Sequence, residues 1–202
     1  VDTGSTDKTK ETAKGICKKF SSEGNELKIV DFKWADDFSA ARNESLKHAT
    51  KDWVLVLDAD EILDQESSEL IKELVNDKEN DAFLFLQKNY TNEASIAGLV
   101  NEAHKKGGMN YSGWYGSFIV RLFRNKKGYE FEGAVHELVE MSIERKKGRI
   151  AAANVVLHHY GNADPNAARK KRQYYLELCK NKAKQSPNAP SYYELGVLYK
   201  EN

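Results

Sequence analysis

The residues best suited to chemistry stand in one short stretch, where three carboxylates follow an apolar run. Residues 53–57, Trp-Val-Leu-Val-Leu, predict a strand buried on both faces, and Asp58, Asp60 and Glu61 follow it directly. Aspartates two positions apart in an extended chain point to the same side, so both can reach one hard cation such as Mg²⁺ or Mn²⁺. At the carboxyl edge of a sheet this pair predicts a ligand site, and a solvated acidic turn is the alternative.

The elements that precede this stretch predict a parallel βαβ unit. Residues 1–7 read as a strand end, a glycine turn and a helix start with Ser5 or Thr6 as N-cap and Asp7 in the first turn. The helix then carries an apolar face, residues 21–25 break it, and residues 27–30 predict the next strand. A second helix over 38–49 leads into the strand at 53. The apolar face is formed by Ala13, Ile16, Cys17 and Phe20.

The elements that follow it predict a change of character. A helix over 67–75 and a strand over 82–86 complete a βαβαβαβ order. Residues 89–110 are polar and irregular. Four short strands without intervening helices then predict an antiparallel or mixed second half. These strands are expected at 118–123, 129–131, 135–139 and 150–158.

The C-terminal part predicts two helices. Asn162 or Asp164 caps a long helix that has Pro165 at its first position and runs to about residue 184. After a break at 186–190, Tyr192-x-x-Leu195-Gly196-x-x-Tyr199 fits the opening of a tetratricopeptide repeat. One such unit cannot bury its own face, so it is either the first of an array or a chance match. We therefore expect one α/β domain over 1–161 and a helical extension over 162–202.

Composition excludes several classes of protein. The 202 residues carry 31 basic and 31 acidic side chains, so no net charge points to nucleic acid or an anionic membrane as a partner. Cys17 and Cys179 are far apart in the sequence, which argues against a disulfide framework and favours a reducing, cytoplasmic location. Peripheral association with the inner face of the membrane is compatible with this expectation. No apolar run approaches the roughly 20 residues of a membrane helix. The chain starts without Met, so we expect an upstream strand and helix to be missing from it.

Several segments together resemble the successive motifs of family 2 glycosyltransferases with the GT-A fold. These are residues 1–7 (VDTGSTD), 38–43 (FSAARN) and 53–61 (WVLVLDADE). Residues 121–124 (RLFR) and 135–137 (VHE) resemble the branch of lipopolysaccharide-core and peptide glucosyltransferases, some of which carry tetratricopeptide repeats. The resemblance covers about residues 1–160 and departs at the front, where the family's opening strand is absent. It implies a Rossmann-like α/β fold with a mixed sheet and a helical C-terminal extension.

The resemblance also implies a nucleotide-sugar donor, with a UDP-sugar such as UDP-glucose expected, and a divalent Mn²⁺ or Mg²⁺ ion as cofactor. Such an ion neutralises the diphosphate leaving group. Asp60 is the expected metal ligand, Asp58 binds the ribose, the metal or a metal-bound water, and Glu61 caps or orients. The expected nucleotide-sugar-binding residues are Asp2, Ser5, Arg42, Asn43 and Asp58.

Two of these residues have plainer alternatives. Arg42, expected near the base or the diphosphate, could instead form a surface ion pair with Asp36 or Asp37. Asn43 could only cap or brace its loop.

An inverting transfer needs a general base on the acceptor side. Glu137 is the candidate, with His136 beside it to orient it; an exposed polar pair on a short strand is the alternative. One residue of the pair His158 and His159 faces inward because strands alternate, and His159 is the candidate third metal ligand.

The acceptor class stays open on the sequence, as a glycan, a lipid-linked sugar or a protein. Trp114 and Tyr115 either stack on a sugar ring or anchor their loop.

Rival readings are weaker. Haloacid-dehalogenase-like phosphatases also place Asp-x-Asp after a strand, but no Gly-Asp pair occurs downstream. A calcium-binding EF-hand loop from Asp58 would place Leu63 where glycine is needed, and zinc is poorly supported by two scattered cysteines. A non-catalytic nucleotide-binding or scaffold module of the same shape is the non-enzyme alternative.

Overall fold

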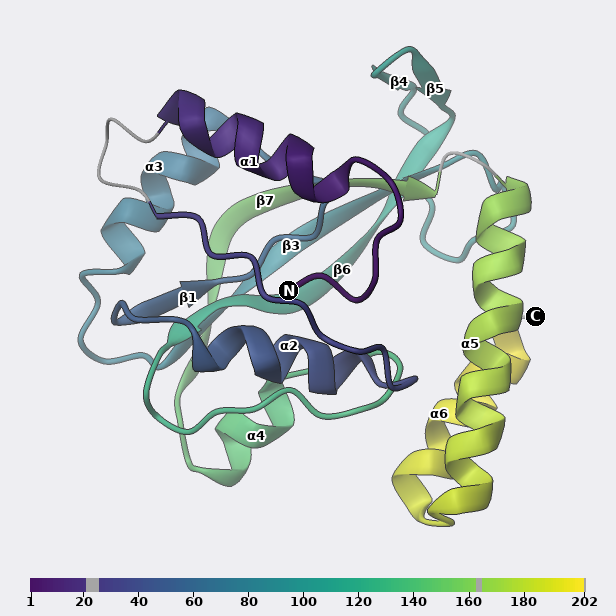
Figure 1. The fold of residues 1–202 in the computed structure, drawn as a ribbon. Coiled ribbons are helices and arrows are strands. Elements are labelled where there is room, and N and C mark those ends of the chain that lie inside the picture. The colour runs from purple at the N-terminus through teal and green to yellow at the C-terminus, as the bar shows by residue number, and fades with distance from the viewer. Residues whose placement is uncertain (21–25, 163–164, 202) are drawn as a thin grey trace.

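The computed structural model describes residues 1–20, 26–162 and 165–201, and a mixed five-stranded sheet forms its centre (Figure 1). The strand order is β1-β6-β3-β7-β2. Strand β3 pairs in parallel with β7, and the other three pairings are antiparallel. The strands are β1 (Trp53–Leu55), β2 (Glu61–Leu63), β3 (Ala82–Thr91), β6 (Gly113–Arg124) and β7 (Ile150–Asn162). A separate hairpin joins β4 (His104–Lys106) to β5 (Met109–Tyr111).

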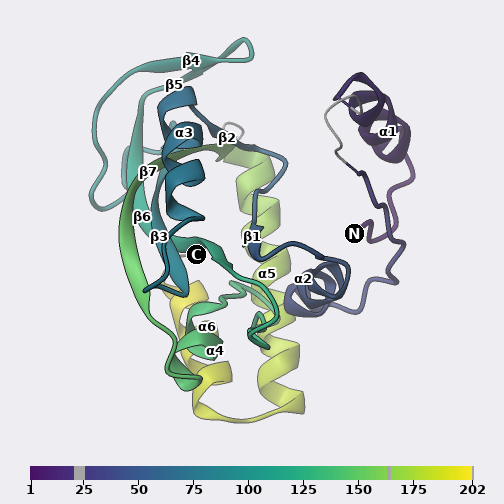
Figure 2. The ribbon, with the colours of Figure 1, turned by 90° about the vertical axis from the view of Figure 1, so that its left-hand side faces the viewer.

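Helices cover both faces of the sheet and form the C-terminal segment (Figures 1 and 2). They are α1 (Thr9–Phe20), α2 (Phe38–Lys47), α3 (Gln65–Leu74), α4 (Glu140–Arg145), α5 (Pro165–Gln185) and α6 (Ala189–Glu201). None of the helices among the described residues is both long and apolar enough to cross a membrane. The α/β class, the mixed sheet and the helical C-terminal segment predicted from the sequence are confirmed.

Alternation along the strands builds two apolar layers, because successive strand residues face opposite sides. On one side Phe83, Phe85 and Leu122 pack against α3. On the other side Val120 and Phe123 pack against α4 and α2. The sheet is therefore fixed from both faces, and its strand ends hold the loops described below in place.

The C-terminal helices pack on the sheet domain through a third apolar cluster. Leu178 and Cys179 of α5 and Leu198 of α6 are buried together with Val135, which lies in the loop before α4. Partly buried side chains from the start of α2 and the chain before it complete the cluster. The first turns of α2 thus lie between the sheet domain and α5.

Two predicted features of the first half are wrong. Residues 27–30 form no strand, and the parallel unit is reduced to an isolated bridge between Asp2 and Asp31. Strand β1 ends at Leu55, pairs antiparallel with β6 and lies at the edge of the sheet. Leu55 at the end of this edge strand and Leu57 beyond it are 39% and 45% exposed rather than buried, and both line the cavity described below.

The start of the first helix also differs from expectation. Helix α1 begins at Thr9, and the Asp7 carboxylate accepts the Thr9 backbone N–H at 3.0 Å, so neither Ser5 nor Thr6 is the cap. Its predicted apolar face is incomplete, since Ile16 is 53% exposed. The predicted break at 21–25 and the cap candidate Asp164 lie outside the described residues, whereas Asn162 ends β7 and α5 begins at Pro165 as predicted.

In the second half, two predicted strands are absent from the described residues. Residues 129–131 form no strand, and of 135–139 only Leu138 pairs, in an isolated bridge with Glu132, before α4 starts. The long strands β6 and β7 contain the predicted 118–123 and 150–158 segments and extend beyond them. Strand β3 likewise continues into the segment predicted to be irregular.

The two-sided core predicts a contrast between two phenylalanines on neighbouring strands. Phe85 is fully buried, whereas Phe118 is 66% exposed. We expect Phe85→Ala to lower the free energy of unfolding by about 3–5 kcal/mol through lost burial and a cavity. Phe118→Ala should change it by about 0.5 kcal/mol or less. Urea denaturation of both variants measures this, and equal losses would contradict the assigned faces.

Candidate active site

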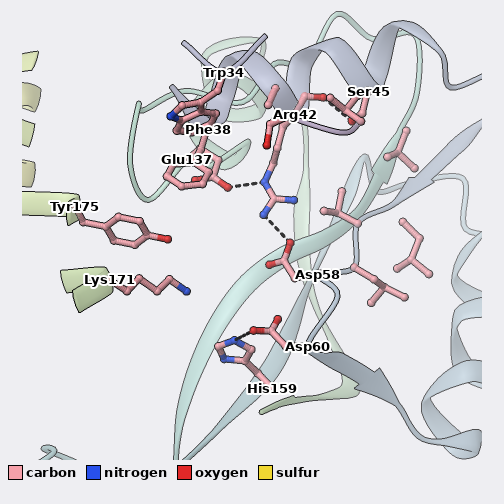
Figure 3. A pocket seen from close by; sticks show the side chains of 17 residues that line it. Trp34, Phe38, Arg42, Ser45, Asp58, Asp60, Glu137, His159, Lys171 and Tyr175 are labelled. Carbon is pink, nitrogen blue, oxygen red and sulfur yellow. Dashed lines mark hydrogen bonds and ion pairs between the residues drawn. The ribbon is translucent and has the colours of Figure 1, made fainter. Parts of the chain in front are cut away.

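A cavity of about 620 Å³ opens beside the acidic turn that joins β1 to β2 (Figure 3). Side chains reach it from α2, from the acidic turn, from the loop before α4, from β7 and from α5. A smaller cavity of about 180 Å³ shares Arg42, Asp58 and Glu137 with it. The lining residues whose side chains matter below are Trp34, Phe38, Arg42, Asp58, Asp60, Glu137, His159, Lys171 and Tyr175.

A buried ion pair holds the acidic turn in position. Glu61 has a fully buried side chain, and its carboxylate accepts hydrogen bonds from Arg121 Nη2 at 2.5 Å and Gln87 Nε2 at 2.5 Å. Its other oxygen accepts the backbone N–H of Asp58 at 2.8 Å. Glu61 therefore orients the turn, as expected, and leaves the cavity to its neighbours.

A β-bulge directs Arg121 to this position. The pairing of β3 with β6 shifts between Phe83 and Leu84, whose partners are Leu122 and Val120, so Arg121 has no opposite residue on β3. Bulges re-aim side chains in this way. The 4% exposed Arg121 consequently points to the carboxylates instead of pairing in register.

Asp58 lies between two arginines. Arg42 Nη2 donates to one carboxylate oxygen at 2.8 Å, and Arg121 Nη2 donates to the other at 2.9 Å. Burial alone would raise the pKa of Asp58, but the two guanidinium groups outweigh burial and hold the pKa below its usual value. Asp58 is therefore ionised and firmly oriented at neutral pH.

Arg42 connects Asp58 to the candidate base. Its Nε donates to Glu137 Oε1 at 2.5 Å, and its guanidinium carbon lies 5.5 Å from the centre of the Phe131 ring. The predicted alternative, a surface ion pair with Asp36 or Asp37, is wrong.

Both aspartates have other partners. Asp37 caps α2 by accepting the Ala40 N–H at 3.1 Å, and Asp36 accepts the Trp34 indole N–H at 2.9 Å. Arg42 is thus free of them and turns into the cavity.

Glu137 and His136 occupy different surroundings. The Glu137 side chain is 12% exposed and borders both cavities, so it is not part of an exposed polar pair. His136 has a left-handed backbone (φ 55°) and an exposed side chain, and its ring meets Tyr175 edge to face at 5.9 Å. Among the hydrogen bonds of the described residues, Arg42 rather than His136 holds Glu137. The expected orienting role thus belongs to Arg42.

Asp60 and His159 form a second group of polar side chains in the cavity. His159 Nε2 lies 3.3 Å from Asp60 Oδ2, and His159 Nδ1 lies 2.7 Å from Asn89 Oδ1. The contact with His159 is the main cause that lowers the pKa of Asp60. His158 faces the opposite side and contacts Tyr90, which confirms that one histidine of the pair points inward.

Gly161 makes this arrangement sterically feasible. A Cβ atom at position 161 would lie 2.3 Å from Asp60 Oδ2 and 2.8 Å from His159 Nε2. Any larger residue would therefore displace both side chains.

The donor set of the cavity fits a cation that keeps open positions. In the described part of the chain, no three His, Cys, Asp or Glu residues gather as a closed metal site. Asp60 and His159 supply two neighbouring donors, while both oxygens of Asp58 are engaged by arginines. Mg²⁺ is commonly held through one or two carboxylates, such as that of Asp60, and completes its shell with substrate phosphates and water. The residues present thus suit an ion that is shared with a ligand.

The remaining predicted ligand-binding residues lie elsewhere. Asp2 accepts the backbone N–H groups of Gly4 and Ser5 at 3.2 and 3.1 Å, and the neighbouring Val1 and Thr3 line the cavity instead. Asn43 exchanges two hydrogen bonds with the backbone of Phe131, at 2.9 and 2.8 Å. Asn43 therefore braces the loop that carries Phe131.

Trp114 lies outside the cavity, in strand β6 rather than in the loop expected there. Its indole N–H donates to Glu102 at 2.7 Å, and Lys88 lies over its ring at 4.3 Å.

Sequence reasoning missed several residues of the cavity. Arg121 did have a signal, since a lone charge inside the apolar run of 118–123 predicts a buried ion pair. Trp34, Phe38, Lys171 and Tyr175 have no local signal, because only the docking of α5 brings them to the cavity.

The buried pair of Arg121 and Glu61 predicts a large loss on removal of one partner. We expect Arg121→Met to lower the free energy of unfolding by about 3–5 kcal/mol, because Glu61 keeps a buried charge without its partner. The exposed pair of Arg149 and Glu79 provides the control, and Arg149→Met should cost about 1 kcal/mol or less. Urea denaturation measures both.

A double variant separates charge from packing. Arg121→Met combined with Glu61→Leu should be more stable than Arg121→Met alone, since no unpaired carboxylate remains. A double variant less stable than the single one would show that packing, and not the buried charge, dominates.

Comparison with known proteins identifies the family of the chain. Residues 1–126 match the family described as "Glycosyl transferase family 2". A TPR repeat-containing protein of Synechococcus elongatus is 35% identical over 167 residues, which are 80% of this chain and 34% of that protein. The glycosyltransferase SunS of the Bacillus subtilis SPbeta prophage is 24% identical over 168 residues, 83% of this chain and 36% of SunS. The chain thus spans about a third of the length of these relatives. Since the family match covers more than half of its 202 residues, the chain belongs to glycosyl transferase family 2.

Proposed function

We propose that this chain is the catalytic part of a metal-dependent, inverting glycosyltransferase. It moves a sugar from a nucleotide-sugar donor, a UDP-sugar by preference, to a hydroxyl or thiol of a glycan, a lipid-linked sugar or a protein. One observation carries the proposal. The cavity joins a candidate metal site, Asp60 and His159, to a candidate base, Glu137, through the ion pairs of Arg42 with Asp58 and Glu137.

The family supports this function, and the printed name of SunS is that of a glycosyltransferase. The proposed organisation is a catalytic domain over 1–161 and a helical extension over 162–202. The name of the Synechococcus relative favours the start of a tetratricopeptide array in this extension and fits the glucosyltransferase branch named above. A cytoplasmic location stays a prediction.

The donor side is assigned by charge. Asp60 and His159 would hold Mn²⁺ or Mg²⁺, which when bound neutralises the diphosphate. Asp58, fixed by Arg42 and Arg121, presents an oriented carboxylate to the ribose. Asp2 and Ser5 lie in the same N-terminal segment as Val1 and Thr3, which line the cavity and where the base would be received.

The acceptor side is assigned by position. Glu137 takes the proton of the acceptor hydroxyl while the acceptor oxygen forms a bond to the anomeric carbon. The bond from that carbon to the diphosphate oxygen breaks, and its electron pair leaves with the diphosphate. Attack from the face opposite the leaving group inverts the anomeric centre. The ion pair with Arg42 Nε holds the Glu137 carboxylate at the border of the cavity, where the acceptor would lie.

The metal assignment predicts metal-dependent donor binding. We expect Mn²⁺ to strengthen UDP binding at least about tenfold in the wild-type chain, because Asp60 and His159 would hold an ion whose positive charge favours the diphosphate. Asp60→Asn should lose this gain. Asp52→Asn, at an exposed position outside the cavity, should keep it. Isothermal titration calorimetry with and without Mn²⁺ measures the three proteins.

A panel of nucleotide sugars, tested for slow hydrolysis, then identifies the donor without an acceptor. Metal-independent UDP binding would rule out the metal site. Binding of a donor without any turnover would favour the non-catalytic nucleotide-binding module, and no binding of any nucleotide would overturn the function.

The base assignment predicts a selective loss of rate. Glu137→Gln should lower hydrolysis of the donor found in that panel by roughly 10²–10⁴-fold while UDP affinity is retained, since water then takes the place of the acceptor. Glu130→Gln, at an exposed position beyond the cavity, should leave the rate unchanged. Unchanged turnover in Glu137→Gln would exclude Glu137 as the base.

A further inference from the structure

Helix α5 presents two polar side chains to the cavity from outside the sheet domain. Lys171 and Tyr175 lie four residues apart, on one face of the helix, and both line the cavity. Figure 3 shows both side chains reaching from α5 towards the side of Asp58 and Asp60. The C-terminal segment therefore forms one wall of the site.

The position of this wall is fixed by aromatic packing. Phe38 of α2 meets Tyr175 edge to face at 5.5 Å and Trp34 at 4.7 Å. The Trp34 indole N–H also donates to the Tyr174 hydroxyl at 2.9 Å. With Cys179 buried below these contacts, α5 is held on the sheet domain along more than one turn.

The charges of the cavity single out Lys171. Arg42 and Arg121 each contact two carboxylates, so their charge is already compensated. Lys171 takes part in no salt bridge among the described residues, and its contact is with the Tyr175 ring, 5.6 Å from the ring centre. It also contributes, after the larger effect of His159, to the lowered pKa of Asp60. Its ammonium group is thus near the candidate metal site and available to a ligand.

We propose that Lys171 binds the diphosphate of the nucleotide-sugar donor, which makes α5 a functional part of the donor site. This inference rests on the proposed function. The guanidinium groups at the cavity are already engaged by the carboxylates of Asp58, Glu61 and Glu137, so an incoming diphosphate needs positive charge that is not yet paired. A lysine ammonium on a flexible stem is suited to phosphate oxygens. As the glycosidic bond breaks, negative charge grows on the diphosphate, and Lys171 stabilises it.

The Tyr175 hydroxyl is a second donor on the same wall. Burial, followed by the charges of Glu137 and Asp58, raises its pKa to about 12, so it stays protonated. It can donate a hydrogen bond to the ligand but cannot serve as a base at neutral pH.

A phosphate-specific binding experiment tests the role of Lys171. In Mn²⁺, Lys171→Met should weaken UDP binding by about 10–100-fold, the loss typical of a hydrogen bond to a charged group. Binding of uridine, which lacks phosphate, should stay within about twofold. Lys171→Arg should restore most of the UDP affinity because it keeps the charge. Lys170→Met, which removes an exposed lysine next to it on the helix but outside the cavity, should match the wild type.

The outcomes separate the inference from the function. If the wild-type chain binds UDP and hydrolyses a donor while Lys171→Met binds UDP equally well, the role of Lys171 is wrong and the proposed function stands. An equal loss for uridine and UDP would also overturn it, since the effect would not concern phosphate. A wild-type chain that binds neither ligand would overturn both.

Discussion

The site depends on a buried positive charge, the guanidinium of Arg121, placed between Asp58 and Glu61. A carboxylate as fully buried as Glu61 is stable only with a partner, and the partner must reach it through the middle of an apolar sheet. The bulge in β6 provides this reach by taking Arg121 out of the pairing register. The acidic turn is thereby bound to the strand behind it rather than to solvent.

Arg42 links the acidic turn to the outer parts of the site. It shares Asp58 with Arg121 on one side and holds Glu137 on the other. Its helix, α2, also supplies Phe38 to the packing of α5. A continuous series of contacts therefore runs from the centre of the sheet to the C-terminal helices, and the cavity lies along it. The family membership of the chain agrees with a site built at strand ends of an α/β sheet.

Much of this architecture could be predicted from local sequence. Local sequence predicts β3, β6, β7 and α3 well. Each of these segments is long enough for its spacing of apolar residues to distinguish a strand from a helix. The run at 53–57 predicted a strand, which forms over Trp53–Leu55, but not its extent, its burial or its neighbours, since an apolar run looks alike in a central parallel strand and an edge antiparallel one. The acidic cluster and Glu137 stood out as candidates because carboxylates after apolar residues are conspicuous in a sequence, and the structure places Asp58, Asp60 and Glu137 at one cavity.

Other parts of the site could not be predicted, because they depend on contacts between distant segments. The partners of Arg42 are 16 and 95 residues away, and nothing near Arg42 in the sequence distinguishes them from the adjacent Asp36 and Asp37. In the sequence, Lys171 and Tyr175 look like ordinary surface residues of a helix, and only the packing of α5 against the sheet domain brings them to the cavity. The bulge at Arg121 likewise follows from the pairing of two strands and not from either strand alone.

Gly161 shows how narrow the tolerance of such a site can be. The backbone of β7 passes so close to the acidic turn that an oxygen of Asp60 occupies the space of a missing methyl group. A single added carbon at this position would press on the ends of two side chains, Asp60 from the acidic turn and His159 from β7, so both would have to move before a larger residue fits.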